Sequence, residues 1–264
     1  MSSPVTIVSG ATFGLGASVA VELARRGHRV VAFGLAERQV SSTAEGTGGL
    51  RAALDAAGVD ADILEADVSN AADVARVVGR TLARHGRIDG LVNNAAIGPL
   101  GSVLDTDEAL FDRVVGVNLK GTYLMSRAVL PPMIGQGGGA IVNVGSGAGH
   151  GKPNMAAYAA SKGGIFALSS AMAYDHFHAR VRVNVVVPGG GGIVSGMSVG
   201  RFGGDVEAFL RRGAPGSAAG RPAGGVDLAN AIAFLLSDEA AAISGTVLDV
   251  GCFANQGGPV PPGP

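Results

Sequence analysis

The chain has 264 residues, a formal net charge of −1 and a sequence pI near 6.5. Apolar residues make up 47% of it, which is enough for a real core and argues against disorder. A nucleic-acid-binding protein would show a basic stripe, which this near-neutral chain lacks, and no run approaches the roughly 18 apolar residues of a membrane span.

Short runs rich in β-branched residues alternate along the chain with longer stretches of helical periodicity. The predicted strands are residues 5–9, 29–33, 62–66, 90–92, 140–144, 181–187 and 246–250. The predicted helices are residues 16–26, 50–57, 70–85, 107–133, 156–177 and 226–237, with a break in the long helix near Asn118. This alternation predicts an α/β fold: a doubly wound parallel sheet, or Rossmann fold, in three α/β/α layers.

One later segment lacks this regularity. Residues 189–225 are rich in Gly, Ser and Pro, and their weak periodicity predicts a loop over the substrate rather than a regular element. No linker divides the chain, so we expect a single domain over residues 1–264. Residues 255–264 are expected to form an extended, proline-rich tail.

A glycine-rich turn, SGATFGLG, lies between the first predicted strand and the first predicted helix. Its glycines, Gly10, Gly14 and Gly16, have the spacing GxxxGxG. Backbone N–H groups and the helix dipole favour an anion such as a diphosphate at such a point. The alternative is an ordinary strand-to-helix turn, because a glycine-rich turn alone is weak support for nucleotide binding.

Three further motifs lie after predicted strands or inside the long helix. Asp67 and Val68, in EADVS, end the third strand where an adenine ring would lie, unless Asp67 caps the next helix. Asn93 and Asn94, in LVNNAAIG, lie at the sheet edge where open α/β sheets bind ligands, and can stabilise the turn, line the pocket or do both. Asn118, in VNLKG, is unusual inside a helix because its side chain competes for backbone hydrogen bonds.

The last motifs combine a serine, a tyrosine and a lysine. Ser146 follows the fifth strand in IVNVGSGAG, and YAASK places Tyr158 and Lys162 one helical turn apart on one face. Each alone would be a turn serine or a surface pair. With VNVVVPG at residues 183–189, the order and spacing of all these motifs resemble the short-chain dehydrogenase/reductase family over nearly the whole chain.

The resemblance implies hydride transfer between a nicotinamide and a carbonyl or alcohol carbon, with Asn118, Ser146, Tyr158 and Lys162 as the catalytic set. A free tyrosine has a pKa of about 10. The Lys162 ammonium and an oxidised nicotinamide would favour its phenolate, so Tyr158 could exchange a proton near neutral pH. Ser146 would hold the substrate oxygen, Lys162 would also bind the nicotinamide ribose, and Asn118 would hold a water that connects Lys162 to solvent.

The resemblance also implies where a cofactor would bind. Pro188 and Gly189 would close over the nicotinamide, and Ile193 and Ser195 fit the family's Ile-x-Thr after a shift of about two residues. The expected cofactor contacts are Gly10, Thr12, Phe13, Gly14, Leu15, Gly16, Gly34, Leu35, Arg38, Asp67, Val68, Asn94, Ala95, Ala96, Tyr158, Lys162, Pro188, Gly189, Ile193 and Ser195.

The choice between NAD and NADP depends on the end of the second strand. Gly34 stands where NAD-preferring relatives carry an acidic residue, and Leu35 stands where NADP relatives often carry Arg. Arg38 could reach a 2′-phosphate, although Glu37 beside it would oppose one. We expect NADP or NAD, with NADP slightly favoured.

The expected enzyme is an NAD(P)-dependent alcohol dehydrogenase or ketone reductase acting on a small molecule. The alternatives are a 3-oxoacyl thioester reductase, which would need a basic patch for its carrier, and a non-catalytic nucleotide-sensing regulator. A regulator would be expected to lose Tyr158 or Lys162. The substrate pocket should draw on residues 97–100, 147–155 and 189–202, where His150 and Lys152 are interpreted as solvent-facing.

The sequence also allows expectations about metal binding, oligomeric state and cellular location. His176 and His178 do not share a helix face, so we expect no metal site. Family members commonly form tetramers through the helices at 107–133 and 156–177, so we expect a homotetramer or homodimer. The start MSSPVTIVSG lacks a signal peptide's basic region, and the single cysteine, Cys252, cannot form an intramolecular disulfide; both favour the cytoplasm.

Overall fold

A seven-stranded parallel sheet forms the centre of the protein. The computed structural model describes residues 3–35, 47–189, 193, 197–198, 205–211, 217–251 and 253. The strands are β1 (Val5–Ser9), β2 (Arg29–Gly34), β3 (Asp62–Glu65), β4 (Gly90–Asn93), β5 (Gly139–Val144), β6 (Val181–Pro188) and β7 (Val247–Val250). They pair in the order β3-β2-β1-β4-β5-β6-β7. The predicted doubly wound parallel sheet is confirmed, and the strand order reverses between β1 and β4.

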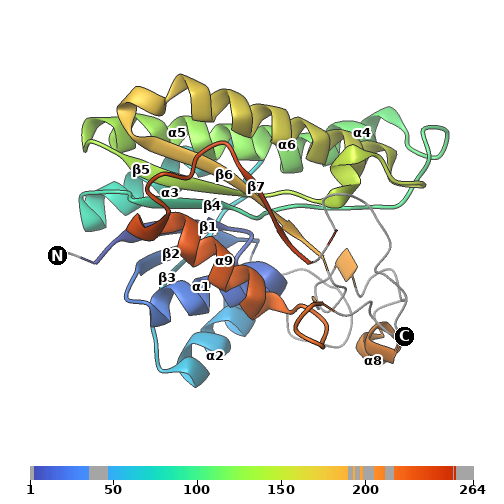
Figure 1. Cartoon of the computed structure of the whole chain (residues 1–264), viewed down its shortest axis with the longest axis horizontal. Coiled ribbons are helices and arrows are strands. Elements are labelled where there is room, and N and C mark those ends of the chain that lie inside the picture. Colours follow the sequence, from blue (N-terminus) through green and yellow to red (C-terminus); the bar gives the residue numbers. More distant parts are fainter. Residues whose placement is uncertain are drawn as a thin grey trace.

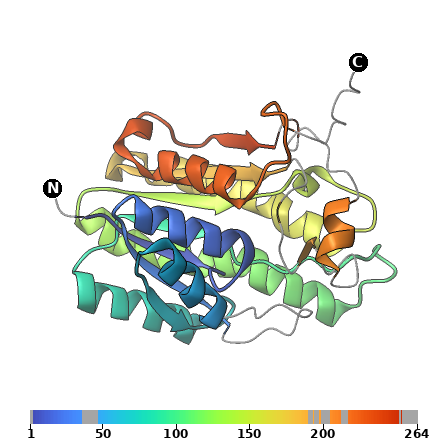
Figure 2. The same cartoon turned by 90° about the horizontal axis from the view of Figure 1, so that it is seen from below.

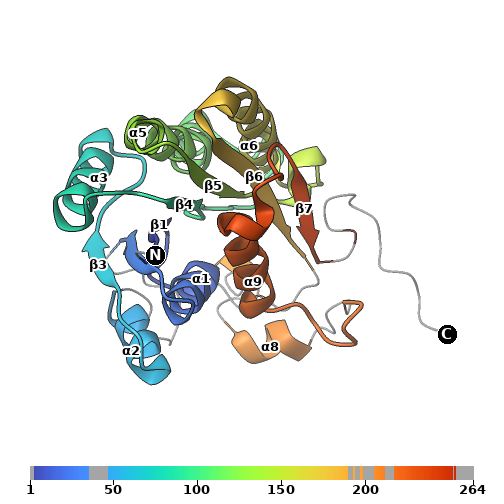
Figure 3. The same ribbon diagram turned by 60° about the vertical axis from the view of Figure 1, so that its left-hand side comes forward.

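Helices cover both faces of this sheet, which gives the three predicted layers (Figures 1 and 3). One face carries α1 (Gly14–Arg25), α2 (Thr47–Ala57) and α9 (Gly225–Leu236). The other carries α3 (Ala71–His85), α4 (Glu108–Val115), α5 (Gly121–Gly135) and α6 (Ala156–Asp175). A short helix, α8 (Val206–Arg211), lies in the glycine-rich segment, where weak periodicity gave no reason to expect one.

Two apolar clusters hold the layers together. Successive strand residues point to opposite faces, so Ile7 joins one cluster and Val8 the other. The cluster under α1 and α9 includes Leu23 and Ile232, and both of these side chains are fully buried. This packing explains why the strands are continuously apolar, because each is covered on both sides.

The long helix predicted over residues 107–133 is interrupted, as expected, near Asn118. A five-residue π-helical turn, Gly116–Lys120, separates α4 from α5. Such π-helical turns inside α-helices are rare and are frequently found at functional sites. Asn118 lies in the middle of this turn with its side chain fully buried, so the break moves a polar group into the protein interior.

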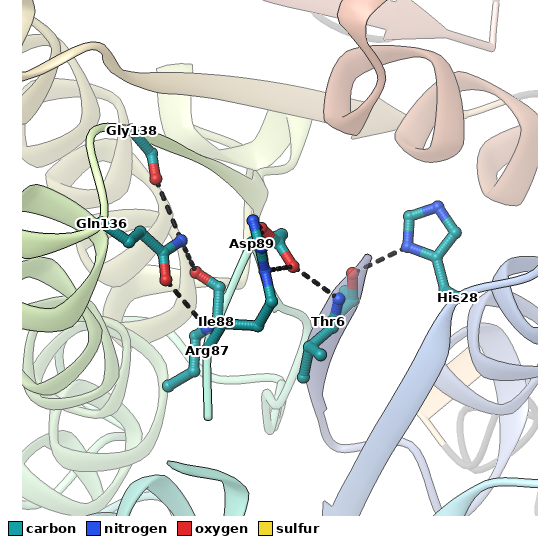
Figure 4. Close-up of polar contacts among 8 residues, drawn as sticks. Thr6, His28, Arg87, Ile88, Asp89, Gln136 and Gly138 are labelled. Atoms are coloured by element: carbon teal, nitrogen blue, oxygen red, sulfur yellow. Dashed lines mark hydrogen bonds and ion pairs between the residues drawn. The ribbon is translucent and has the colours of Figure 1, made fainter. Parts of the chain in front are cut away.

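All seven strands end at the same edge of the sheet, the right-hand side of Figures 1 and 2. The opposite, amino edge is closed by a polar network (Figure 4). There Gln136 binds both the N–H and the carbonyl of Ile88, and His28 shares a 2.8 Å hydrogen bond with Thr6. Burial lowers the pKa of His28. Open α/β sheets bind ligands at the carboxyl edge, so we expect the functional site at that edge rather than at the amino edge.

Candidate active site

The glycine-rich turn between β1 and α1 is tightly packed against the end of β4. Gly10 and Gly14 have φ values of +62° and +59°, which favour glycine. A Cβ atom at Gly16 would lie 2.2 Å from the Gly10 carbonyl oxygen. The Asn94 side chain donates to the carbonyls of Ser9 and Gly10, at 3.1 and 2.9 Å. The conformation of the turn therefore favours glycine at positions 10 and 14, and its packing leaves no space for a side chain at position 16.

The start of α1 is suited to an anion. The residue before the helix, Phe13, provides no side-chain hydrogen bond to it, so the first N–H groups are not capped in that way. Helix N-termini of this kind attract phosphate through their free N–H groups and the helix dipole. The turn and the helix start together fit the diphosphate of a dinucleotide.

We predict that Gly16→Ala weakens nucleotide binding at least tenfold, because the new methyl group would displace the Gly10 carbonyl. Overpacking of this kind typically costs about 1–3 kcal/mol of stability. The matched control is Gly79→Ala in α3, where an added Cβ meets nothing within 4 Å. It should raise stability slightly, since Gly inside a helix is unfavourable. Calorimetric titration with nucleotide and denaturant unfolding test both; unchanged affinity in Gly16→Ala would contradict the assignment.

The end of β2 lies directly against this turn. A Cβ at Gly34 would be 2.8 Å from the Thr12 hydroxyl, and Thr12 is buried. A side chain at position 34 would therefore displace the side chain of Thr12. Leu35, the next residue, is 51% exposed. Arg38 lies outside the described residues.

The segment after β3 shows whether Asp67 caps the next helix or is available to the expected adenine site. Asn70, not Asp67, caps α3, accepting bonds from the N–H groups of Ala72 and Asp73. The Asp67 carboxylate instead accepts bonds from the N–H and hydroxyl of Ser69, at 2.8 and 2.7 Å. These bonds leave Asp67 held at the carboxyl edge, where the cofactor is expected.

Neighbouring residues fix this part of the edge. Val68 is buried and packs against Gly121, where an added Cβ would lie 2.9 Å from its Cγ1 atom. Ala95 lies against Gly10, with its Cα 2.6 Å from the position of an added Cβ. Ala96 follows it in the same loop.

The two asparagines after β4 have different roles. Asn94 stabilises the glycine turn, as described above. Asn93 points into the core, where its amide donates to Asn143 at 2.8 Å and to Ser126 at 3.1 Å. Asn93 is only 4% exposed, so it contributes to the interior rather than to the pocket.

Tyr158 and Lys162 lie together on α6, facing the end of β5. The Lys162 ammonium nitrogen is 5.8 Å from the centre of the Tyr158 ring. It donates a 2.7 Å hydrogen bond to the carbonyl of Val144, the last residue of β5. Both side chains are buried, with 8% of Tyr158 and 2% of Lys162 exposed. The sequence spacing thus brings a phenol and an ammonium into one protected position.

Burial has a clear electrostatic effect on Lys162. Loss of solvent lowers the pKa of its ammonium from 10.5 to about 8. The group therefore stays mostly charged at pH 7 and becomes neutral above pH 8. A positive charge near Tyr158 is available across the neutral range.

Ser146 lies two residues beyond Val144, at the start of a short 3-10 helix, η2 (Gly147–His150). Its Oγ accepts a 3.2 Å bond from the N–H of Ala148. Because the oxygen accepts this bond, its own O–H remains able to donate. The carbonyl that binds Lys162 and the hydroxyl of Ser146 thus both lie at the carboxyl end of β5.

Asn118 is clamped by the loop after β4. Its Oδ1 accepts from the N–H of Ile97 at 2.8 Å, and its Nδ2 donates to the Ile97 carbonyl at 2.9 Å. The same Nδ2 donates to the hydroxyl of Ser161 at 2.9 Å. The Asn118 carbonyl accepts a bond from Thr122 at 2.7 Å. Its buried amide is thus fully engaged by protein groups.

The opposite wall of the site begins where β6 ends. Pro188 ends that strand and Gly189 follows, so close to Gly251 that a Cβ there would lie 2.1 Å from the Gly189 Cα. Ile193 packs on the α1–α9 cluster. Met197 lies against Gly98, with its sulfur 2.7 Å from an added Cβ. Ser195 lies outside the described residues.

The pocket residues that carry ionisable groups lie toward solvent. His150 and Lys152 are both exposed, as predicted, and the His150 ring stacks on Phe166 at 5.1 Å. Over the part of the chain that the structure describes, no group of three or more His, Cys, Asp or Glu residues could hold a metal. Within the same part, no helix combines the length and apolar character needed to cross a membrane.

Sequence reasoning missed one contributor to this site and one contact. Ser161, which lies between Tyr158 and Lys162 in YAASK, received no role from the sequence, yet its hydroxyl accepts a hydrogen bond from the Asn118 amide. The sequence did contain a signal for this role, because a serine at position 161 carries a hydrogen-bonding hydroxyl that the alanines beside it lack. The contact of Met197 with Gly98 has no local signal, since it joins segments about 100 residues apart in the chain.

Comparison with known proteins identifies the family of the chain. A family model described as enoyl-(acyl carrier protein) reductase matches residues 10–252. The 2-(S)-hydroxypropyl-CoM dehydrogenase 3 of Xanthobacter autotrophicus is 39% identical, covering 98% of this chain and 97% of its own. The 3-oxoacyl-(acyl-carrier-protein) reductase of Escherichia coli is 32% identical, covering 93% and 95%. The crystal structure of an actinorhodin polyketide ketoreductase variant with NADPH has a TM-score of 0.83 and 31% identity, covering 96% of this chain and 97% of that one. The chain therefore belongs to the short-chain dehydrogenase/reductase family.

Proposed function

We propose that Tyr158 is the proton-exchanging group of this NAD(P)-dependent oxidoreductase, which acts on CH–OH groups, and that Lys162 keeps its phenolate accessible. The observation that carries the proposal is the buried ammonium 5.8 Å from the phenol ring. The positive charge attracts the negative charge of the phenolate, and this attraction lowers the pKa of the Tyr158 phenol from its ordinary value.

The proposed chemistry assigns a distinct task to each side chain. In oxidation, the substrate hydroxyl gives its proton to the Tyr158 phenolate, while Ser146 donates a hydrogen bond to the substrate oxygen. In reduction, Tyr158 returns the proton to the oxygen of the ketone. When bound, the nicotinamide supplies or accepts the hydride. Positioning by Ser146 and Tyr158 provides the rest of the acceleration.

Lys162 has two further N–H groups besides the one that binds the Val144 carbonyl. We propose that they bind the nicotinamide ribose and a water leading to solvent. The Asn118 amide is already engaged by Ile97 and Ser161, so its backbone carbonyl is the group proposed to hold that water. That carbonyl accepts the Thr122 hydroxyl at 2.7 Å, and a carbonyl oxygen can accept more than one hydrogen bond.

For the cofactor, we propose the diphosphate at Gly10–Gly16 and the adenosine between Leu35 and Asp67. The preference remains a proposal of NADP over NAD. It is supported by the absence of an acidic side chain at Gly34, which packs closely against Thr12. Michaelis constants for the two reduced cofactors would test it, and a lower value for NADH would contradict it.

The substrate is proposed to be a small secondary alcohol or ketone. Relatives include one named for a hydroxypropyl-CoM substrate and one named for a 3-oxoacyl carrier substrate. Because of the second relative, a 3-oxoacyl thioester reductase is proposed as the alternative function. A nucleotide-sensing regulator is disfavoured, because Tyr158 and Lys162 are both present and lie together.

We also propose a cytoplasmic homotetramer, with a homodimer as the alternative. Large apolar side chains are exposed on the helical layer, including Phe111, Tyr123 and Tyr174, at 42%, 44% and 84%. Light scattering should give four times the 26.0 kDa of one chain. A mass equal to one chain would contradict this assembly.

The direct test of function is nicotinamide absorbance with both cofactors and a panel of secondary alcohols, ketones and 3-oxoacyl thioesters. Turnover of simple ketones is expected. Activity confined to carrier-bound thioesters would support the alternative. Tight nucleotide binding with no turnover of any substrate would support the regulator.

A further inference from the structure

We infer that Ser161 is a positioning residue for the acid–base pair: its hydroxyl fixes the turn of α6 that carries Tyr158 and Lys162 against the π-helical turn and the loop after β4. The inference rests on the proposed function of those two side chains. It adds a residue that neither the catalytic set nor the expected cofactor contacts include.

The Ser161 hydroxyl both donates and accepts a hydrogen bond. Its O–H donates a 2.8 Å hydrogen bond to the backbone carbonyl of Tyr158, and its oxygen accepts a 2.9 Å bond from the Asn118 amide. Both Ser161 and Asn118 have no exposed surface. Water therefore cannot easily replace a lost partner, and an unsatisfied buried group would be unfavourable.

These bonds join three segments that are distant in sequence. The Asn118 amide also clamps Ile97 through both its N–H and its carbonyl. A continuous line of hydrogen bonds thus runs from Tyr158 through Ser161 and Asn118 to Ile97. The next residue after Ile97 is Gly98, which lies against Met197, so the line reaches two segments that are expected to contribute to the substrate pocket.

The helix alone cannot provide this positioning. It fixes the spacing of Tyr158 and Lys162 relative to each other, but not their place relative to the neighbouring segments. Lys162 adds one anchor, at the Val144 carbonyl of β5. Ser161 adds a second anchor, at the Asn118 amide of the π-helical turn. Since a displacement of about 1 Å can reduce a rate by about 100-fold, the second anchor should matter for catalysis.

The chain offers a matched control on the same helix. Ser169 is buried, donates to the carbonyl of Ile165 at 2.6 Å and accepts the Asn143 amide at 2.8 Å. Its chemistry is therefore the same as that of Ser161. It differs in its partner, because Asn143 lies inside β5 and Ser169 is seven residues beyond Lys162.

The test compares Ser161→Ala with Ser169→Ala in the full-length protein. Ser161→Ala should lower kcat about tenfold, while Ser169→Ala should stay within about twofold of wild type. Thermal midpoints of the two variants should fall by similar amounts. The pH profile of kcat/KM and the phenolate absorbance of Tyr158 without cofactor should move to higher pH only in Ser161→Ala.

Two outcomes would overturn the inference: full activity in Ser161→Ala, or equal activity losses and unchanged pH profiles in both variants. If Ser161→Ala does not fold, Ser161→Cys fills similar space with a weak hydrogen-bonding group and should lose activity comparably; full activity would contradict the proposal. A failure of the proposed function itself is recognised separately, because Tyr158→Phe would then remain active.

Discussion

Replacing Tyr158 with phenylalanine is expected to lower kcat by about 10³-fold, within the range of 10² to 10⁴ typical of a lost general acid or base. The change removes only the hydroxyl, and Tyr158 is only 8% exposed, so the packing of its ring should persist. Nucleotide affinity should change by no more than a few-fold. Steady-state kinetics in both directions, with separate titration of the nucleotide, measure these effects.

The matched control for this variant is Tyr123→Phe. Tyr123 lies on α5 and is 44% exposed, so its hydroxyl should not affect the rate. If Tyr158→Phe keeps more than a tenth of the wild-type kcat while folded, another group must exchange the proton.

Lys162→Met is expected to abolish most activity and yet to gain stability relative to wild type at neutral pH. The folded protein lowers the pKa of this ammonium from 10.5 to about 8, so burial of its charge opposes folding below pH 8. The unfolded chain binds the proton more strongly, and wild-type stability therefore rises between pH 8 and 10.5. The difference of about 2.5 units corresponds to about 3 kcal/mol.

The stability advantage of Lys162→Met should thus be largest below pH 8 and should decrease by about 3 kcal/mol by pH 10.5. Loss of the hydrogen bond to Val144 shifts the whole curve without changing its shape. Denaturant unfolding without nucleotide measures this, and a Tyr158→Phe background removes the titration of the phenol. Lys120→Met, at an exposed lysine, is the control. A pH-independent difference would contradict the burial of a charged Lys162.

Most of the fold could be predicted from the sequence because local patterns and burial agree. Every predicted strand is present, since runs such as VTIVS are apolar on both faces and are covered by helices on both sides. The break at Asn118 could be placed because asparagine is unfavourable in a helix. Its π-helical form and its partners Ile97 and Ser161 could not, because these partners are distant from Asn118 in the sequence.

The site was predictable to the extent that motif spacing decides it. Tyr158 and Lys162 lie one turn apart, so a helix necessarily brings them together. The pairing of Asn93 with Asn143 across β4 and β5 depends on strand register, which single-sequence reasoning does not provide. The close packing of Gly34 against Thr12 likewise joins residues that lie 22 apart in the sequence.

Ionisation of Tyr158 itself is the most direct measurement. The chain has three tyrosines and no tryptophan, so the phenolate absorbance of wild type minus Tyr158→Phe isolates one group. With oxidised nicotinamide cofactor bound, we predict that this phenol ionises at a clearly lower pH than free tyrosine, and that Lys162→Met moves its ionisation to higher pH. Ionisation in wild type at the pH of free tyrosine, or at the same pH in both proteins, would contradict the account.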